Sequence, residues 1–155
     1  MAAMRTDGRR RPPDRQPTLL AAWRAALADH DPRRLVIGGK SMGGCMASLI
    51  TDEAGVAGLV CLGFPFHAPG KPAAPRIAHL ARLATPTLIV QGGRDTMGNA
   101  TEVPRYDLSA AITIHWIDDA DHSLVPSKAS GVPEHVAWAE AVDCTARFVK
   151  KVMKR

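Results

Sequence analysis

Aromatic side chains are scarce in this sequence: they make up 5% of its 155 residues, although 46% of the chain is hydrophobic. Aliphatic side chains and alanine must therefore supply most of any hydrophobic core. Charged residues account for 23% of the chain, which is ordinary for a globular protein. The length predicts one domain with a sizeable core.

Cysteines are also few, and none of the three, Cys45, Cys61 and Cys144, forms a C-x-x-C pair. This excludes a disulfide scaffold and favours a reducing compartment. No apolar stretch near the start resembles a signal peptide, and no run approaches the ~20 apolar residues that span a membrane. We therefore expect a cytoplasmic protein without a membrane partner.

Positive charge gathers at the two ends of a chain whose formal net charge is +5. Residues 1–15 hold five arginines, interrupted by Pro12, Pro13 and Asp14, and four basic residues lie between 150 and 155. No nucleic-acid-binding motif accompanies them, so solvated ends are the better interpretation and no nucleic-acid partner is expected. We predict a basic arm rich in proline and arginine over 1–15 and one domain over 16–155.

Short apolar runs alternate with helical patterns along the rest of the chain. Strands are predicted at 35–37, 56–62, 87–90 and 112–117, and helices at 18–29, 42–51, 76–83, 102–108 and 132–152. The last strand alternates in polarity, which is typical of a sheet edge. In the last helix, five residues are expected to form one apolar side: Val136, Ala139, Val142, Ala146 and Val149. The order predicts an α/β fold with a mostly parallel sheet and helices on both faces.

The first strand leads into Gly39-Lys40-Ser41-Met42-Gly43, a match to G-x-S-x-G between a strand and a helix. A turn this tight excludes neighbouring side chains, and it exposes a serine hydroxyl beside the helix N-terminus. Ser41 is therefore a candidate nucleophile, and the Met42 N–H a candidate oxyanion donor. The alternative is a glycine-rich turn between strand and helix that serves only for packing. A P-loop is excluded, because Arg34 stands where that motif needs its first glycine.

Two further polar residues follow later strands. Asp95 comes directly after the third strand and could orient a histidine, although a helix cap is its simpler role. His122 follows the fourth strand and could act as general base, with His67 as its competitor. The order Ser, Asp, His is that of the α/β-hydrolases. All three residues lie beyond strand ends, where active sites of open α/β sheets occur. No metal or organic cofactor is expected.

Four segments carry a resemblance to a known family: Gly-Gly-Lys-Ser-Met-Gly-Gly at 38–44, Leu-Gly-Phe-Pro-Phe-His at 62–67, Gln-Gly-Gly-Arg-Asp at 91–95, and Asp-His-Ser-Leu at 121–124. Together they resemble the dienelactone-hydrolase-like branch of the α/β-hydrolases. More narrowly, they are similar to small bacterial hydrolases grouped with the testis-expressed and NSL-complex-subunit-like proteins. The resemblance implies acyl-ester chemistry with Ser41, Asp95 and His122, and a pocket wall that includes Phe64, Phe66 and His67.

The chain departs from the family pattern at its start. Relatives have several strands before the nucleophile strand, and a loop after an early strand supplies the second oxyanion N–H. Here one helix precedes that strand, so we expect an N-terminally truncated domain, the C-terminal part of the fold, with an exposed sheet edge through which it could form homo-oligomers.

Two functions follow from this reading. The first is a serine hydrolase that acts on a small carboxylester or thioester. The alternative is a non-catalytic hydrolase-like module used for protein association.

Overall fold

The computed structural model describes residues 14–71 and 77–154. Most of the predicted arm therefore lies outside the described residues. Within the described part, four strands form one parallel sheet in the order β1-β2-β3-β4. They are β1 (Val36–Lys40), β2 (Gly58–Leu62), β3 (Thr87–Gly92) and β4 (Ile112–Ile117). The predicted fold class, a parallel sheet between helices, is confirmed.

The registers bring the carboxyl ends of the strands to one edge of the sheet. Lys40 pairs with Leu62, Leu62 with Val90, and Gly92 with Ile117. The central strands are buried on both faces, as their continuous apolar runs predict: Leu88, Ile89 and Val90 are at most 4% exposed. The loops that follow Lys40, Gly92 and Ile117 therefore lie near one another.

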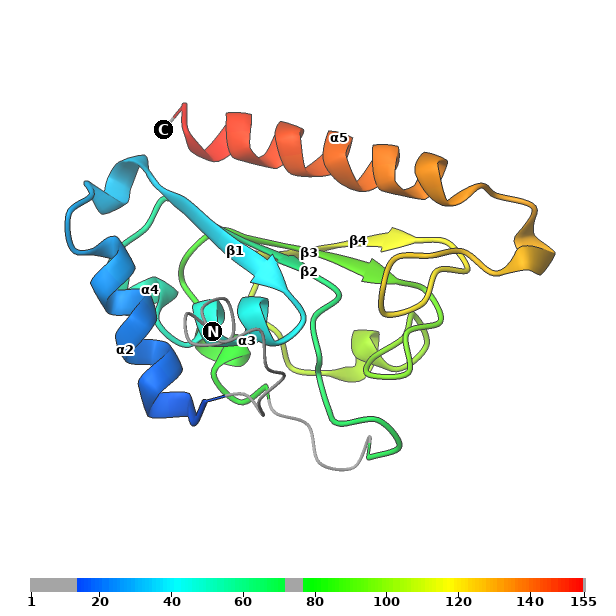
Figure 1. Ribbon diagram of the computed structural model, residues 1–155, viewed down its shortest axis with the longest axis horizontal. Coiled ribbons are helices and arrows are strands. Elements are labelled where there is room, and N and C mark those ends of the chain that lie inside the picture. Colours follow the sequence, from blue (N-terminus) through cyan, green and yellow to red (C-terminus); the bar gives the residue numbers. More distant parts are fainter. Residues whose placement is uncertain (1–13, 72–76, 155) are drawn as a thin grey trace, which may run out of the picture.

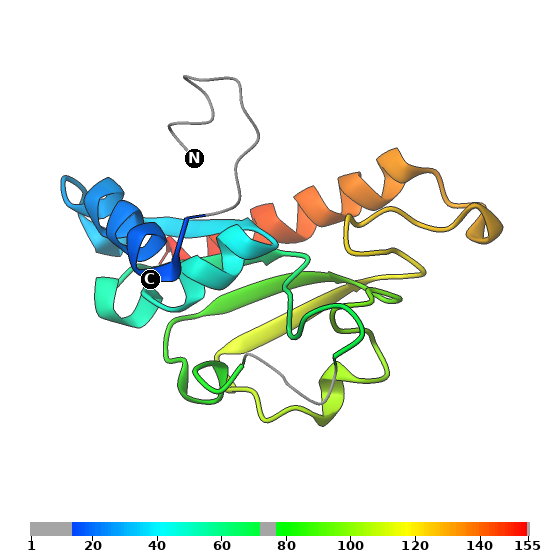
Figure 2. The same ribbon diagram turned by 60° about the horizontal axis from the view of Figure 1, so that its bottom comes forward.

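Helices cover both faces of the sheet (Figures 1 and 2). The long helix α5 (Glu134–Val152) crosses one face, and α2 (Gln16–Leu27), α3 (Met42–Ser48) and α4 (Thr51–Ala54) lie on the other. Each face has its own apolar core. Phe64, Phe66 and Ile89 belong to the core on the α3 side, and Leu88, Val90 and Ala141 to the core under α5.

Three predicted helices are shorter than expected. The helix predicted over 42–51 is divided into α3 and α4, where the Ser48 hydroxyl donates to the Cys45 carbonyl and competes with the helix backbone. The helix predicted over 102–108 is one 3₁₀ turn, Val103–Arg105, because the backbone becomes extended at Tyr106, with a ψ of 146°. The helix predicted over 76–83 starts outside the described residues and contains the 3₁₀ turn Leu80–Arg82.

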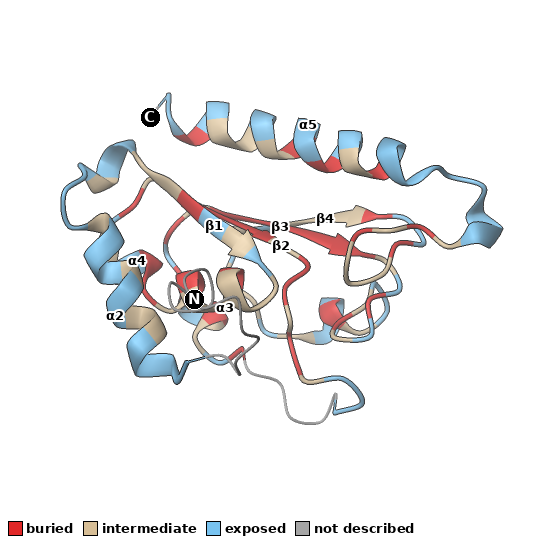
Figure 3. Ribbon diagram, viewed as in Figure 1, coloured by how far each residue is buried: buried red, intermediate tan, exposed pale blue. Residues whose placement is uncertain are grey.

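The apolar side predicted for the last helix is wrong. Figure 3 shows a buried stripe along the side of α5 that faces the sheet. This stripe is formed by Ala137, Ala141, Cys144 and Val152, with Phe148 half-buried beside them. Of the residues that were expected there, Val136 is 45% and Val142 is 61% exposed. The helix has apolar residues on two sides, and small residues occupy the side that lies against the sheet.

Candidate active site

Ser41 occupies a strained turn between β1 and α3. Its φ of 50° and ψ of −119° lie outside the conformations that a residue with a β-carbon usually adopts. The Ser41 N–H donates to the Leu62 carbonyl oxygen at 2.9 Å, which ties the turn to the end of the neighbouring strand. The hydroxyl is thereby held above the carboxyl edge of the sheet, half-exposed.

The glycines around Ser41 differ in what they permit. A β-carbon on Gly39 would lie 2.7 Å from the Gly43 carbonyl carbon, and one on Gly44 would lie 2.7 Å from the Gly39 oxygen. At Gly43, by contrast, a β-carbon would meet no atom within 4 Å. The steric reading of the motif therefore holds for Gly39 and for Gly44, which lies outside the pentapeptide, but not for Gly43.

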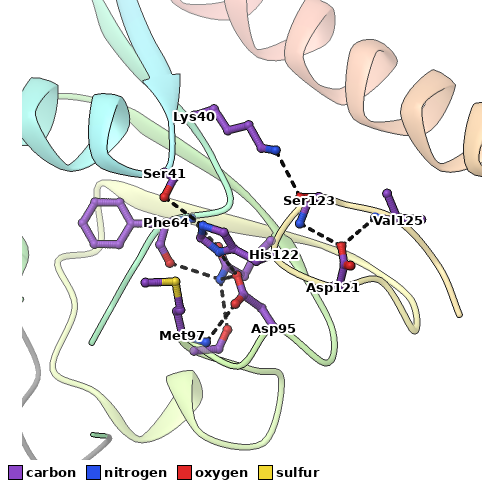
Figure 4. A network of polar contacts seen from close by, with 11 residues as sticks. Lys40, Ser41, Phe64, Asp95, Met97, Asp121, His122, Ser123 and Val125 are labelled. Carbon is purple, nitrogen blue, oxygen red and sulfur yellow. Dashed lines mark hydrogen bonds and ion pairs between the residues drawn. The ribbon is translucent and has the colours of Figure 1, made fainter. Parts of the chain in front are cut away.

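Ser41, His122 and Asp95 form one hydrogen-bonded chain (Figure 4). The Ser41 Oγ lies 2.8 Å from His122 Nε2, and His122 Nδ1 lies 2.7 Å from Asp95 Oδ2. A carboxylate can only accept, so Nδ1 carries the proton and the lone pair of Nε2 faces the serine hydroxyl. Asp95 is fully buried, whereas the His122 side chain is 26% exposed. This arrangement can remove a proton from Ser41 and stabilise the imidazolium that results.

The Asp95 carboxylate has further donors on both oxygens. Oδ1 accepts from the Met97 N–H at 2.8 Å, and Oδ2 accepts from Gln91 Nε2 at 2.7 Å as well as from His122. A buried charge needs such donors, since desolvation without them is costly. Asp95 is thereby fixed in position and orientation.

The loop that carries His122 is fixed by its own contacts. Asp121 Oδ1 accepts from the Ser123 and Val125 N–H groups, at 2.8 and 3.1 Å. Lys40, next to the nucleophile, reaches across and donates to Ser123 Oγ at 3.3 Å. Two glycines give this loop room: a β-carbon on Gly92 would lie 2.2 Å from the Asp121 oxygen, and one on Gly63 would lie 2.5 Å from the His122 oxygen.

The structure brings His122, and not His67, to Ser41. His67 is 3% exposed, and its Nδ1 donates to the Ala68 carbonyl at 2.8 Å. Its Nε2 lies 2.9 Å from Glu102, at ion-pair distance but outside hydrogen-bonding geometry. Burial acts to raise the pKa of Glu102, but the Tyr106 hydroxyl and His67 outweigh it and lower that pKa. Burial and the bond to Glu102 raise the pKa of Tyr106 to about 12.

Phe64 and Phe66 are fully buried, with ring centroids 5.0 Å apart in an edge-on arrangement. With His67 they form part of the core beneath the site, and a wall role for these three residues stays a prediction. Met42 is the first residue of α3, so its N–H lacks a partner within the helix, as an oxyanion donor would.

Three further residues of the site, Gln91, Gly63 and Gly92, have no role that the sequence pattern predicts. They lie at strand ends, within two of the segments that carry the family resemblance, and only this placement indicates that they belong to the site. Within residues 14–71 and 77–154, no group of three or more His, Cys, Asp or Glu side chains is placed to hold a metal ion. In the same part of the chain, no helix has the length and apolar character that a membrane crossing requires.

Comparison with known proteins places this geometry in a family. A family model described as the alpha/beta hydrolase domain matches residues 1–150.

Three similar solved structures share the fold at low sequence identity. The esterase domain of a Rhodothermus marinus protein is 20% identical, with a TM-score of 0.53 over 81% of this chain and 67% of that one. A CIB-like hydrolase from Thermoplasma acidophilum is 18% identical, with a TM-score of 0.54 over 71% of this chain and 52% of that one. A dienelactone hydrolase-like promiscuous phosphotriesterase from metagenomic libraries is 15% identical, with a TM-score of 0.59 over 88% of this chain and 62% of that one. The chain thus spans between about half and two thirds of the length of these structures.

Proposed function

Because this chain belongs to the alpha/beta hydrolase family, we propose that it is a serine hydrolase that cleaves a small carboxylester or thioester through an acyl-enzyme. The observation that carries the proposal is the chain of hydrogen bonds from Ser41 through His122 to Asp95, at 2.8 and 2.7 Å. The strained backbone at Ser41 adds support, since strain of this kind gathers at active sites. The esterase and phosphotriesterase activities named for two of the similar structures belong to those proteins.

In the proposed reaction, Ser41 Oγ bonds to the acyl carbon while its proton passes to His122 Nε2. The carbonyl electrons move to the oxygen, where the Met42 N–H donates to the developing charge. Collapse of this intermediate expels an alkoxide or thiolate, which takes the proton from His122. A water molecule then repeats the sequence on the acyl-enzyme, releasing the acid and returning a proton to Ser41. Asp95 stays ionised throughout and stabilises the imidazolium.

A fluorophosphonate probe tests the proposal, because Ser41 would displace fluoride and bond to phosphorus, its proton passing to His122. The wild-type chain should be labelled, and Ser41→Ala and His122→Ala should not. Ser48→Ala is the matched control. Ser48 is also 2.8 Å from a histidine, His79, but it is 2% exposed and its one hydroxyl hydrogen goes to the Cys45 carbonyl.

Labelling of Ser48→Ala and loss in the other two variants would support the assignment. A folded wild-type chain that is never labelled would refute it. Hydrolysis of nitrophenyl esters, measured beside thioesters of the same acyl groups, then distinguishes the two substrate classes.

We propose a second, separate function, self-association, for which a groove beside the sheet edge gives the support. Among the described residues, β1 pairs with β2 alone, which leaves its other backbone edge unpaired. On the α5 side of the sheet, a groove of about 440 Å³ is lined by apolar parts of Leu62, Val142, Ala146 and Val149. It shares Leu62 and Val149 with a second groove, which is lined by β1 itself. A second copy could pair its own β1 along this edge and cover the groove.

Sedimentation over a range of concentrations tests the association. Dimers should form in the wild type and be lost in Val142→Lys, which places a charge in the groove. Thr113→Lys is the control, because Thr113 is exposed on β4 at the opposite edge of the sheet. A chain that stays monomeric at every concentration would exclude self-association.

Two finer expectations stay proposals. One is the narrower likeness to the testis-expressed and NSL-complex-subunit-like group. The other is a cytoplasmic location, for which the support is that the buried Cys61 and Cys144 are free thiols.

A further inference from the structure

Gln91 is a polar side chain in the most buried strand of the sheet. It lies near the end of β3, after Leu88, Ile89 and Val90, and it has no exposed surface. An apolar residue would satisfy the core at this position at lower cost, because a buried amide must find partners for every donor and acceptor. The partners that Gln91 has found therefore indicate what it does.

The side-chain amide joins three separate segments of the site. Its oxygen accepts from the Phe64 N–H at 2.7 Å. Its nitrogen donates to Asp95 Oδ2 at 2.7 Å, to the Gly98 carbonyl at 3.0 Å and to the Phe64 carbonyl at 3.2 Å. The shortest of these donor contacts is the one to the carboxylate.

The orientation of the amide follows from its partners. The Phe64 N–H can only donate, so the Gln91 oxygen must face it, and the nitrogen must then face Asp95. The same Asp95 oxygen lies 2.7 Å from His122 Nδ1. Gln91 therefore holds the atom that orients the histidine, and it ties that atom to the turn after β2 and to the loop that follows Asp95.

We propose that Gln91 is a positioning residue, which acts through Asp95 to keep His122 aligned with Ser41. The proposal rests on the proposed hydrolase function for its kinetic consequences, but its geometric content can be tested without catalysis. It predicts that removal of the donor slows attack by Ser41 on the order of 10²-fold, the cost expected of a displacement of about 1 Å in a reacting group.

Gln91→Met is the first variant, because methionine has nearly the same shape and no amide. Its rate of fluorophosphonate labelling should fall on the order of 10²-fold with little change in the concentration of probe that gives half the maximal rate. Leu88→Ala is the control for a merely structural effect. Leu88 is on the same strand and 4% exposed, but it belongs to the core under α5. It should lose stability and keep a labelling rate close to that of the wild type.

Gln91→Glu tests for a pH dependence of the labelling rate that a merely structural role would not produce. An ionised glutamate keeps the acceptor for the Phe64 N–H but offers Asp95 no donor, whereas a protonated one can donate its O–H to Asp95. Burial and the neighbouring Asp95 favour the protonated form, and the only other titratable group in the hydrogen-bonded chain is His122. The labelling rate of Gln91→Glu relative to the wild type should therefore increase as the pH is lowered.

Proton NMR separates this proposal from the proposed function. The Nδ1 proton of His122, identified by its absence in His122→Gln, should be protected from solvent in the wild type and in Leu88→Ala and should exchange rapidly in Gln91→Met. An unchanged Nδ1 resonance and an unchanged labelling rate in folded Gln91→Met would overturn the positioning role. If the wild type is never labelled but the Nδ1 resonance is lost in Gln91→Met, the hydrolase function is refuted. The positioning role of Gln91 is then still supported.

Discussion

Gly63 and His122 lie so close together that a β-carbon on Gly63 would stand 2.5 Å from the His122 carbonyl oxygen. Gly63 directly follows β2, and His122 lies in the loop after β4, so the two residues belong to loops that follow different strands. The end of one strand thus sets the position of the loop that carries the general base.

Gly63→Ala should therefore damage both stability and reactivity. Gly63 has a φ of 62°, so alanine adds backbone strain of about 1–2 kcal/mol to the contact with His122. Urea unfolding and the rate of fluorophosphonate labelling measure the two effects. Gly70→Ala is the matched control, since Gly70 has a φ of 69° and, among the described residues, no atom within 4 Å of an added β-carbon. Gly70→Ala should lose stability through backbone strain alone and keep its labelling rate. Equal labelling rates in Gly63→Ala and Gly70→Ala would contradict a steric contact between residue 63 and His122.

Gly43 and Gly44 should respond oppositely to alanine. Both lie in α3, where alanine is favoured over glycine by about 1 kcal/mol. Gly43→Ala meets no atom within 4 Å and should be neutral or slightly stabilising. Gly44→Ala places a β-carbon 2.7 Å from the Gly39 oxygen and 3.1 Å from the Cys61 side chain, so a loss of about 1–3 kcal/mol is expected. Thermal unfolding of Gly43→Ala and Gly44→Ala measures this difference. Equal stabilities of the two variants would contradict the steric explanation of the turn.

Phe66→Ala should unfold the chain more readily, because Phe66 is fully buried and its ring contacts those of Phe64 and Tyr106. Loss of a buried phenylalanine costs about 3–5 kcal/mol in free energy of unfolding. Val132→Ala, at a site 42% exposed, should change it by less than about 0.5 kcal/mol. If Phe66→Ala kept full stability and altered only the preference for acyl chain length, the pocket-wall role would be supported instead.

Asp52 should contribute to stability at neutral pH and lose that contribution in acid. Burial acts to raise its pKa from 3.8, but hydrogen bonds from the Thr85 hydroxyl and from the Ala84 and Thr85 N–H groups lower it. A lowered pKa in the folded state means that the stabilisation is complete above the ordinary value and disappears as the pH falls through the folded value.

Asp52→Asn should therefore cost about 1 kcal/mol near neutral pH, a modest figure because the site is exposed. The difference from the wild type should shrink in strong acid. Urea unfolding across the acid range tests this, with the exposed Asp107→Asn as control. A difference that stays constant with pH would contradict the assignment.

The parts of the fold that the sequence predicted are those in which local pattern and tertiary environment agree. Strands β2 and β3 are short apolar runs that a parallel sheet buries on both faces, and β4 alternates in polarity, as the edge of a sheet allows. Ser41 was identifiable because its turn needs Gly39, and His122 because it directly follows a strand. The helix predicted over 42–51 is interrupted where Ser48 makes a side-chain hydrogen bond to the backbone, and the one predicted over 102–108 ends where the backbone becomes extended at Tyr106.

Other features depended on contacts between distant segments. The apolar residues of α5 suggest two sides, and only packing against the sheet selected Ala137 and Ala141 over Val142. From the sequence alone Gln91 is an ordinary strand residue, because its three partner residues lie as far as 27 positions away. The periodicity of hydrophobic residues along the sequence does not reveal contacts between such distant residues.

The sequence by itself determined the order of strands and helices, the strained turn at Ser41 and the placement of Asp95 and His122 beyond strand ends. These follow from local sterics and from the two periods of hydrophobicity, which are properties of neighbouring residues. Tertiary contacts were needed to show that His122 rather than His67 reaches Ser41, that Gln91 holds Asp95, and which side of α5 is buried. The first two depend on the parallel strand register, which brings residues separated by tens of positions to within hydrogen-bonding distance, and the third depends on the packing of α5 against the sheet.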